Sequence, residues 1–182
     1  MIILETPMGQ VPILEYDGVV FCQSTTIARF LAKKYNLAGK DDVAAAEADQ
    51  VVDALNDIFA HFVAWRHESD ESKKIEMMKV LIEETVPAWL QMMEKYLVSK
   101  GGQHLAGGQL TWADLALYNF ATIIIRVCYF VTFTYDQCHV LIQDRTPQIK
   151  LSDYQHIDGL VQRVGDLPRI KKWINERPIT EM

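Results

Sequence analysis

The sequence predicts a mixed fold class, with a short α/β segment over residues 1–38 followed by an all-helical domain over residues 43–182. Three observations predict it. The first part carries an apolar run led by a proline, an Asp-Gly pair and a short amphipathic stretch, which indicate a strand, a turn, a second strand and a helix. From Val43 onward, apolar residues recur at helical spacing over long stretches. Between them, Asn36 to Asp42 has a glycine and charged residues typical of a linker.

The stretch from Gly9 to Tyr35 contains the candidate binding residues. Its apolar run, Val11 to Leu14, has Pro12 near its start, where a proline need not donate to a strand ladder. Asp17-Gly18 favours the positive φ angles of a type I′ hairpin turn. Ser24 is a favoured N-cap residue, and the apolar residues that follow it lie on one helical face.

Two features of this stretch suit a small acidic peptide. A proline beside an open strand edge holds backbone groups outward, above all when the Val11–Pro12 bond is cis, so an extended peptide could pair with Val11 by strand addition. The helix that starts at Ser24 offers free N–H groups, a hydroxyl and the positive end of a helix dipole to a carboxylate. The alternative is an ordinary hairpin and helix with no ligand.

Residues 43–182 predict five helices and one strand. Thr111 and Asp114 have the spacing of a capping box, so Asp114 is expected to be structural. Pro87 is expected to kink or break the helix that contains it. Val127 to Tyr135 is rich in aromatic and β-branched residues, and predicts a strand. The expected helices cover residues 44–65, 75–98, 111–126, 151–164 and 167–174.

Composition excludes several classes of protein. The net charge of −6 argues against nucleic-acid binding. The three cysteines show no CxxC or zinc spacing, and an odd, sparse set suits the reducing cytoplasm. The start of the chain does not have the pattern of a signal peptide, and no apolar run of about 18 residues predicts a membrane span. We therefore expect a cytoplasmic protein without nucleic-acid or membrane partners.

Several motifs together resemble one family. They are Gln10-Val11-Pro12-Ile13-Leu14, Asp17-Gly18, and Gln23-Ser24-x-x-Ile27-Ala28-Arg29-Phe30-Leu31. Their combination resembles the glutathione-binding half of cytosolic glutathione transferases, most of all the sigma class, which includes haematopoietic prostaglandin D synthase. The C-terminal pattern Val164-x-x-Leu167-Pro168-x-Ile170-x-x-Trp173-Ile174-x-x-Arg177-Pro178 is also typical of that family.

The resemblance implies a binding site for glutathione. Val11, flanked by Gln10 and Pro12, would hydrogen-bond the cysteinyl backbone, and Gln23 and Ser24 would hold the γ-glutamyl carboxylate. Asp57 would reach the amino group from the partner chain of a homodimer. The implied fold is an incomplete thioredoxin-like domain over residues 1–38 and a helical C-terminal domain over residues 43–182.

The resemblance also implies a reaction, conjugation of glutathione to a small hydrophobic electrophile or isomerisation of a prostaglandin-type substrate. In the family, a strand, a helix and a strand with the catalytic Tyr precede the proline, whereas this chain begins almost at Pro12. Tyr16 lies in the strand after the proline and is not expected to substitute. We therefore expect no catalytic residue in this chain, and weak or no transferase activity. The alternatives are a non-catalytic transferase-like structural or interaction protein and, ranked lower because CxxC is lacking, a redox enzyme.

Two further expectations concern metal binding and an insertion. Some sigma-class members bind a divalent cation through an Asp-x-x-Asp-Asp group, but here Asn56 stands between Asp53 and Asp57 in that pattern, so we expect no cation. A solvated acidic face is the alternative use of these carboxylates. Residues from Val127 to about Arg145 have no counterpart in the family, which indicates an insert over residues 127–145. A gene-model or splicing product and a genuine loop insertion near the substrate pocket are its two interpretations.

Overall fold

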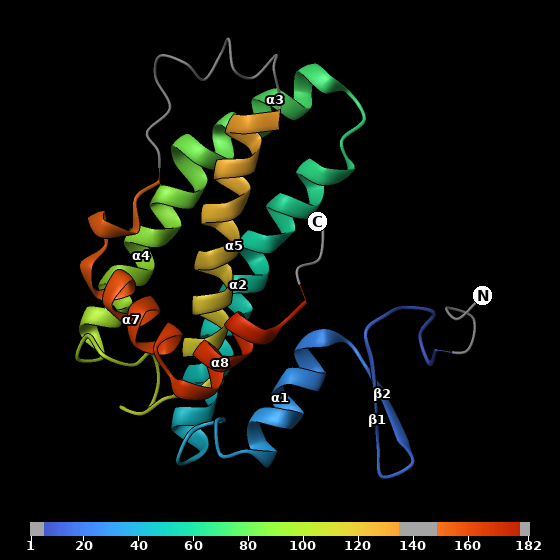
Figure 1. Cartoon of the computed structure of the whole chain (residues 1–182), viewed down its shortest axis with the longest axis vertical. Coiled ribbons are helices and arrows are strands. Elements are labelled where there is room, and N and C mark those ends of the chain that lie inside the picture. Colours follow the sequence, from blue (N-terminus) through green and yellow to red (C-terminus); the bar gives the residue numbers. More distant parts are fainter. Residues whose placement is uncertain (1–5, 135–148, 179–182) are drawn as a thin grey trace.

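The structure is a computed structural model that describes residues 6–134 and 149–178, with the side chains of residues 125–134 excepted. A hairpin and one helix lie beside a bundle of longer helices (Figure 1). The elements of the first part are β1 (Ile13–Tyr16), β2 (Val19–Cys22) and α1 (Ser24–Lys34). Those of the bundle are α2 (Asp42–His67), α3 (Glu71–Val80), η2 (Leu81–Thr85), α4 (Val86–Ser99), α5 (Trp112–Thr134), η3 (Leu151–Asp153), α7 (Gln155–Gly165) and α8 (Pro168–Glu176).

The predicted hairpin is confirmed. Strands β1 and β2 pair antiparallel, with Ile13 opposite Cys22 and Tyr16 opposite Val19. Asp17 and Gly18 have φ angles of 50° and 76°, as a type I′ turn requires. One face of the hairpin packs on α1, where the ring of Phe30 lies 5.2 Å from that of Tyr16 and 4.8 Å from that of Phe21.

The start of α1 differs from the expectation by one residue. Ser24 was predicted as the N-cap, but that position belongs to Gln23, and Ser24 is the first helical residue. The reason is that the carbonyl of Gln23 already accepts a hydrogen bond from the N–H of Ile27 at 2.9 Å. At its other end α1 is tied to the bundle, because the N–H of Trp112 donates to the carbonyl of Leu37 at 2.8 Å.

The core lies between the long helices of the bundle. Phe120 of α5 is fully buried, and its ring lies 5.2 Å from that of Phe59 on α2 and 4.8 Å from that of Trp89 on α4. The indole N–H of Trp89 donates to the carbonyl of Ala54 at 3.2 Å, which joins α4 to α2. Met93 is buried in the same core, and Met78 is buried with Ile82 in a smaller cluster.

The helix predicted over residues 75–98 contains a widened turn. It begins earlier, at Glu71, and the π-helical turn η2 at Leu81–Thr85 stands immediately before Pro87. A proline ring clashes with the carbonyl four residues before it, here that of Glu83, and this widened turn relieves the clash. The predicted interruption at Pro87 is thus confirmed in the form of a local change of helix type.

The predicted strand at Val127–Tyr135 is wrong over its first eight residues, because α5 continues as a helix to Thr134. A continuous apolar run lacks the periodicity that distinguishes a strand from a buried helix, and residues 127–131 form such a run. Tyr135 and most of the expected insert lie outside the described residues. None of the described helices, α5 included, has both the length and the apolar character of a membrane span.

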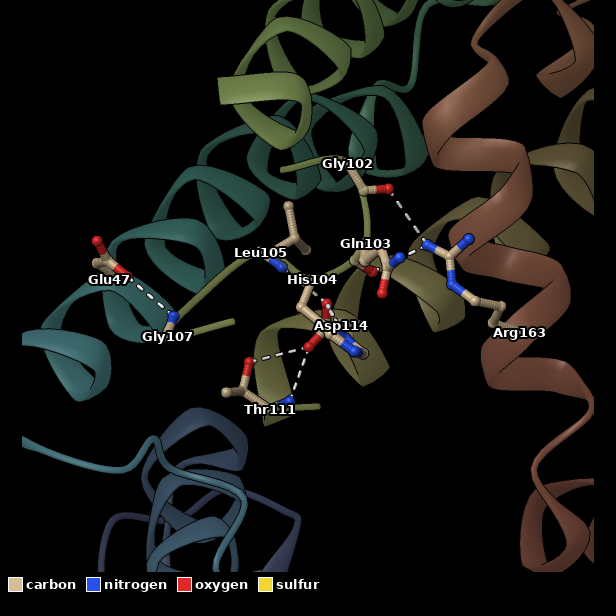
Figure 2. Close-up of polar contacts among 9 residues, drawn as sticks. All are labelled: Glu47, Gly102, Gln103, His104, Leu105, Gly107, Thr111, Asp114 and Arg163. Carbon is tan, nitrogen blue, oxygen red and sulfur yellow. Dashed lines mark hydrogen bonds and ion pairs between the residues drawn. The ribbon is translucent and has the colours of Figure 1, made fainter. Parts of the chain in front are cut away.

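A glycine-rich loop, residues 101–108, connects α4 and α5. Side chains from three helices hold it through its backbone, as Figure 2 shows. The contacts are Leu105 N–H to Asp114 Oδ1 at 2.9 Å, Gly107 N–H to Glu47 Oε2 at 3.0 Å and Arg163 Nη2 to the carbonyl of Gln103 at 2.9 Å. Because this loop fixes the start of α5, it also fixes the wall on which α1 rests.

Candidate functional site

The residues before β1 and after β2 meet at one end of the hairpin. The ladder begins with the pair Ile13 and Cys22, so Pro12 and Gln23 are the next residues outward on the two strands. The side-chain Nε2 of Gln23 donates to Oε1 of Gln10 at 3.3 Å and approaches the sulfur of Met8 at 3.9 Å. The structure thus gathers Gln10, Val11, Pro12, Gln23 and Ser24 into one place, which we name the proline clamp.

The backbone at the proline is open to an incoming peptide. The Val11–Pro12 bond is cis. Val11 is 64% exposed and stands outside the ladder that joins β1 to β2. Among the described residues, its N–H and carbonyl make no backbone hydrogen bond, so an extended ligand can pair with them by strand addition.

Gln23 has a backbone conformation that is uncommon for a residue with a side chain. Its φ angle of 70° lies in the left-handed region, which favours glycine. Such positions cost free energy and are concentrated at functional sites, where the surrounding structure maintains them. Here the conformation turns the chain from β2 directly into α1, and brings the exposed amide of Gln23 beside Gln10.

The N-terminus of α1 is suited to an anion. No side chain among the described residues caps this end of the helix, and its first turn contains no acidic residue. The N–H groups of the first turn and the exposed hydroxyl of Ser24 are therefore available to a carboxylate. The positive end of the helix dipole points the same way.

The carboxylates on the acidic face of α2 have different surroundings. Asp49 Oδ2 lies 3.0 Å from Nε of Arg29 and forms an ion pair with it, although the angle does not suit a hydrogen bond. Asp53 Oδ1 lies 4.0 Å from Nη2 of the same guanidinium. Asp57 is exposed, and no described contact joins it to the proline clamp of its own chain. Asn56 links the same face to α1, because its Nδ2 donates to Oγ1 of Thr25 at 3.4 Å.

Among the residues that the structure describes, no group of three or more His, Cys, Asp or Glu side chains lies close enough together to hold a metal ion.

Tyr16 is held away from the clamp. Its hydroxyl accepts a hydrogen bond from Nζ of Lys34, near the far end of α1, and this bond raises the pKa of Lys34. Its ring packs against Phe30.

Sequence reasoning missed Arg29 and Trp112. The guanidinium of Arg29 lies 5.4 Å from the centroid of the Trp112 ring and beside Asp49, so it connects α1 with both α2 and α5. The spacing of Asp49 and Asp53, one helical turn apart, places both carboxylates on one face of α2, but nothing in the sequence indicates that Arg29 is their partner. The contact with Trp112 had no signal either, since it joins residues far apart in the chain.

The geometry defines a class of protein, in which a hairpin with a cis proline and an uncapped helix rests on a helical bundle. The family described as "Glutathione S-transferase, C-terminal domain" matches residues 56–177. The chain belongs to the glutathione S-transferase family.

Its relatives agree with the sigma-class resemblance. Glutathione S-transferase 1 of Ascaris suum is 34% identical, over 97% of this chain and 78% of that protein. The hematopoietic prostaglandin D synthase of Mus musculus is 32% identical, over 97% of this chain and 77% of that protein. The solved structure of prostaglandin synthase D of Nilaparvata lugens superposes with a TM-score of 0.75 at 36% identity, over 98% of this chain and 80% of that one.

Proposed function

We propose that this chain binds glutathione at the proline clamp. Val11 pairs through its backbone with the cysteinyl residue, and Gln10 and Pro12 border that contact. Gln23 and Ser24 hold the γ-glutamyl carboxylate at the N-terminus of α1. The observation that carries the proposal is the left-handed backbone of Gln23, which places its amide beside an uncapped helix end.

The proposal extends to a homodimer of two-domain chains in the cytoplasm. Residues 1–38 form the glutathione-binding domain and residues 43–182 the helical one. Asp57 completes the site of the partner by pairing with the glutathione amino group, which agrees with its exposure and with the lack of a described contact between Asp57 and the clamp of its own chain. The second substrate is a small hydrophobic electrophile or a prostaglandin-type molecule.

For the 182 residues themselves, we propose weak turnover. Activation of the glutathione thiol needs a donor that stabilises the thiolate. The tyrosine of the hairpin, Tyr16, is committed to Lys34 at the other end of α1. The same observation favours a second candidate function, a non-catalytic binding protein with the transferase fold.

Retention on immobilised glutathione tests the proposal. The double variant Gln23→Ala, Ser24→Ala removes the carboxylate contacts, and should bind about tenfold more weakly or worse. A matched double variant at exposed positions outside the clamp, Gln91→Ala, Ser72→Ala, should bind like the wild type. Equal retention of the two double variants would contradict the proposal. Conjugation of an aryl halide at the rate of an active transferase would exclude the non-catalytic role.

A further inference from the structure

Two acceptors of unequal strength share the side-chain amide of Gln23. An amide nitrogen of this kind carries two N–H groups. Oε1 of Gln10 lies 3.3 Å from Nε2 of Gln23, and the thioether sulfur of Met8 lies 3.9 Å from the same nitrogen. An amide oxygen is a full hydrogen-bond acceptor, whereas a thioether sulfur is a weak one. Gln10 therefore engages one N–H group, and Met8 holds the other only weakly.

The N–H group that faces Met8 is the one that a ligand can take. A carboxylate at this place must first displace the thioether sulfur. That displacement is favourable, because a hydrogen bond to an ionised acceptor is much stronger than one to a thioether. The chemical state of the Met8 sulfur therefore decides whether this group of Gln23 is available to glutathione.

Met8 is accessible to a small oxidant. It is 64% exposed, whereas Met78 and Met93 are each only 3% exposed. Hydrogen peroxide can transfer one oxygen atom to its sulfur: the O–O bond breaks, an S–O bond forms, the sulfur loses two electrons and the peroxide is reduced to water. The product, methionine sulfoxide, is polar, and methionine sulfoxide reductases convert it back to the thioether.

We propose that Met8 is an oxidation site that regulates the proline clamp, where the sulfoxide oxygen takes the second N–H group of Gln23 and excludes the γ-glutamyl carboxylate. This inference rests on the proposed binding of glutathione. The new oxygen extends one bond beyond the sulfur, so it closes the gap of 3.9 Å that the sulfur leaves to Nε2. The hydrogen bond to Gln10 keeps the amide of Gln23 at this place.

Calorimetric titration with glutathione, before and after hydrogen peroxide, tests the proposal on the whole chain. The peroxide is removed first, and dithiothreitol restores oxidised thiols but not the sulfoxide. The wild type should lose affinity about threefold to tenfold, and the two methionine sulfoxide reductases together should restore it. Met8→Leu has no sulfur, so its affinity should be the same before and after peroxide. Met92→Leu removes the other exposed methionine of the described residues, and should lose affinity as the wild type does.

Two further measurements follow the contact between Met8 and Gln23 itself. Met8→Gln places an amide oxygen at residue 8 without any oxidant, so it should bind glutathione about threefold to tenfold more weakly than the wild type. In nuclear magnetic resonance spectra recorded without glutathione, peroxide should shift the side-chain N–H signals of Gln23 in the wild type and leave them unchanged in Met8→Leu. These signals report on the contact independently of ligand binding.

The outcomes separate this proposal from the proposed function. If the untreated wild type does not bind glutathione, the proposed function and its regulation both fail. If the untreated wild type binds glutathione but peroxide leaves its affinity unchanged, only the regulation is overturned. An equal loss of affinity in Met8→Leu would also overturn it, because the loss would then come from another oxidised residue such as Cys22.

Discussion

The carboxylate of Asp114 accepts two hydrogen bonds from Thr111, three residues before it. Asp114 Oδ2 receives the backbone N–H of Thr111 at 2.7 Å and its hydroxyl at 3.1 Å (Figure 2). The other oxygen receives the N–H of Leu105 at 2.9 Å. All of these groups are buried, so one side chain both starts α5 and anchors the connector before it.

Replacing this carboxylate should be costly. Asp114→Ala leaves two buried N–H groups and a hydroxyl without an acceptor, so we expect it to lower the free energy of unfolding by about 3 kcal/mol. Asp41 is the control, because it caps α2 at an exposed position, where its Oδ1 accepts from the N–H of Ala44 at 2.8 Å. Asp41→Ala should cost about 1 kcal/mol. Urea unfolding measures both, and equal costs would show that burial of Asp114 adds nothing.

A second carboxylate makes the stability depend on pH. Glu94 of α4 accepts the N–H groups of His156 at 2.9 Å and Ile157 at 3.0 Å, and lies 2.7 Å from Nδ1 of His156. Burial raises the pKa of Glu94, but the hydrogen bonds from His156 and Ile157 outweigh it and lower this pKa below its ordinary value. A lowered folded-state pKa means that Glu94 stabilises the fold above the pKa of the unfolded chain, and loses this effect as the pH falls through the folded value.

We therefore expect Glu94→Gln to be less stable than the wild type at pH 7, by about 1–2 kcal/mol. The difference should begin to shrink as the pH falls through about 4.5, where the carboxylate of the unfolded chain takes up a proton, and should be lost only below the lowered pKa of Glu94 in the folded state. Glu84→Gln, at an exposed position of η2, serves as the control, and its stability relative to the wild type should show no such pH dependence. Thermal unfolding between pH 7 and pH 2 measures this, and a constant gap for Glu94→Gln over that range would contradict it.

Local patterns allowed most of the fold to be predicted. Asp17-Gly18 and the Thr111–Asp114 spacing each specify a structure within four residues, and both predictions were confirmed. The contacts of Glu94 with His156 join residues 62 positions apart, for which a single sequence holds no signal. The strand predicted at residues 127–134 failed because apolar runs in buried helices and strands look alike. The candidate site followed from motifs, but the left-handed backbone of Gln23 did not, since it depends on how β2 meets α1.

The left-handed backbone of Gln23 predicts that two variants at this position differ in stability but not in the loss of glutathione binding. Glycine adopts a φ angle of 70° without strain, whereas alanine does not. Gln23→Gly should therefore be about 1 kcal/mol more stable than Gln23→Ala. Both variants lose the amide, so both should bind glutathione more weakly than the wild type. Urea unfolding and calorimetric titration test the pair, and equal stabilities would show that the backbone is not strained.

Asp57 provides the most direct test of a site shared between two chains. If Asp57 acts on the glutathione of the partner, Asp57→Asn should weaken binding about tenfold, as expected for the loss of a charge-assisted hydrogen bond. Asp53→Asn should leave glutathione binding unchanged, because Asp53 lies beside Arg29 of its own chain.

Mixing two defective variants distinguishes a site shared between two chains from a site formed within one chain. In a mixed dimer, one chain carries Asp57→Asn and the other carries Gln23→Ala, Ser24→Ala. If the site is shared, the intact clamp of the first chain then meets the intact Asp57 of the second chain across the interface. Tight glutathione binding should then return to at most half of the chains, although each variant alone binds weakly. If Asp57 serves its own chain, every site in the mixed dimer remains defective and mixing restores nothing. Calorimetric titration before and after the two chains are refolded together therefore decides whether the carboxylate is supplied across the interface, and native mass spectrometry that finds only single chains would contradict the homodimer itself.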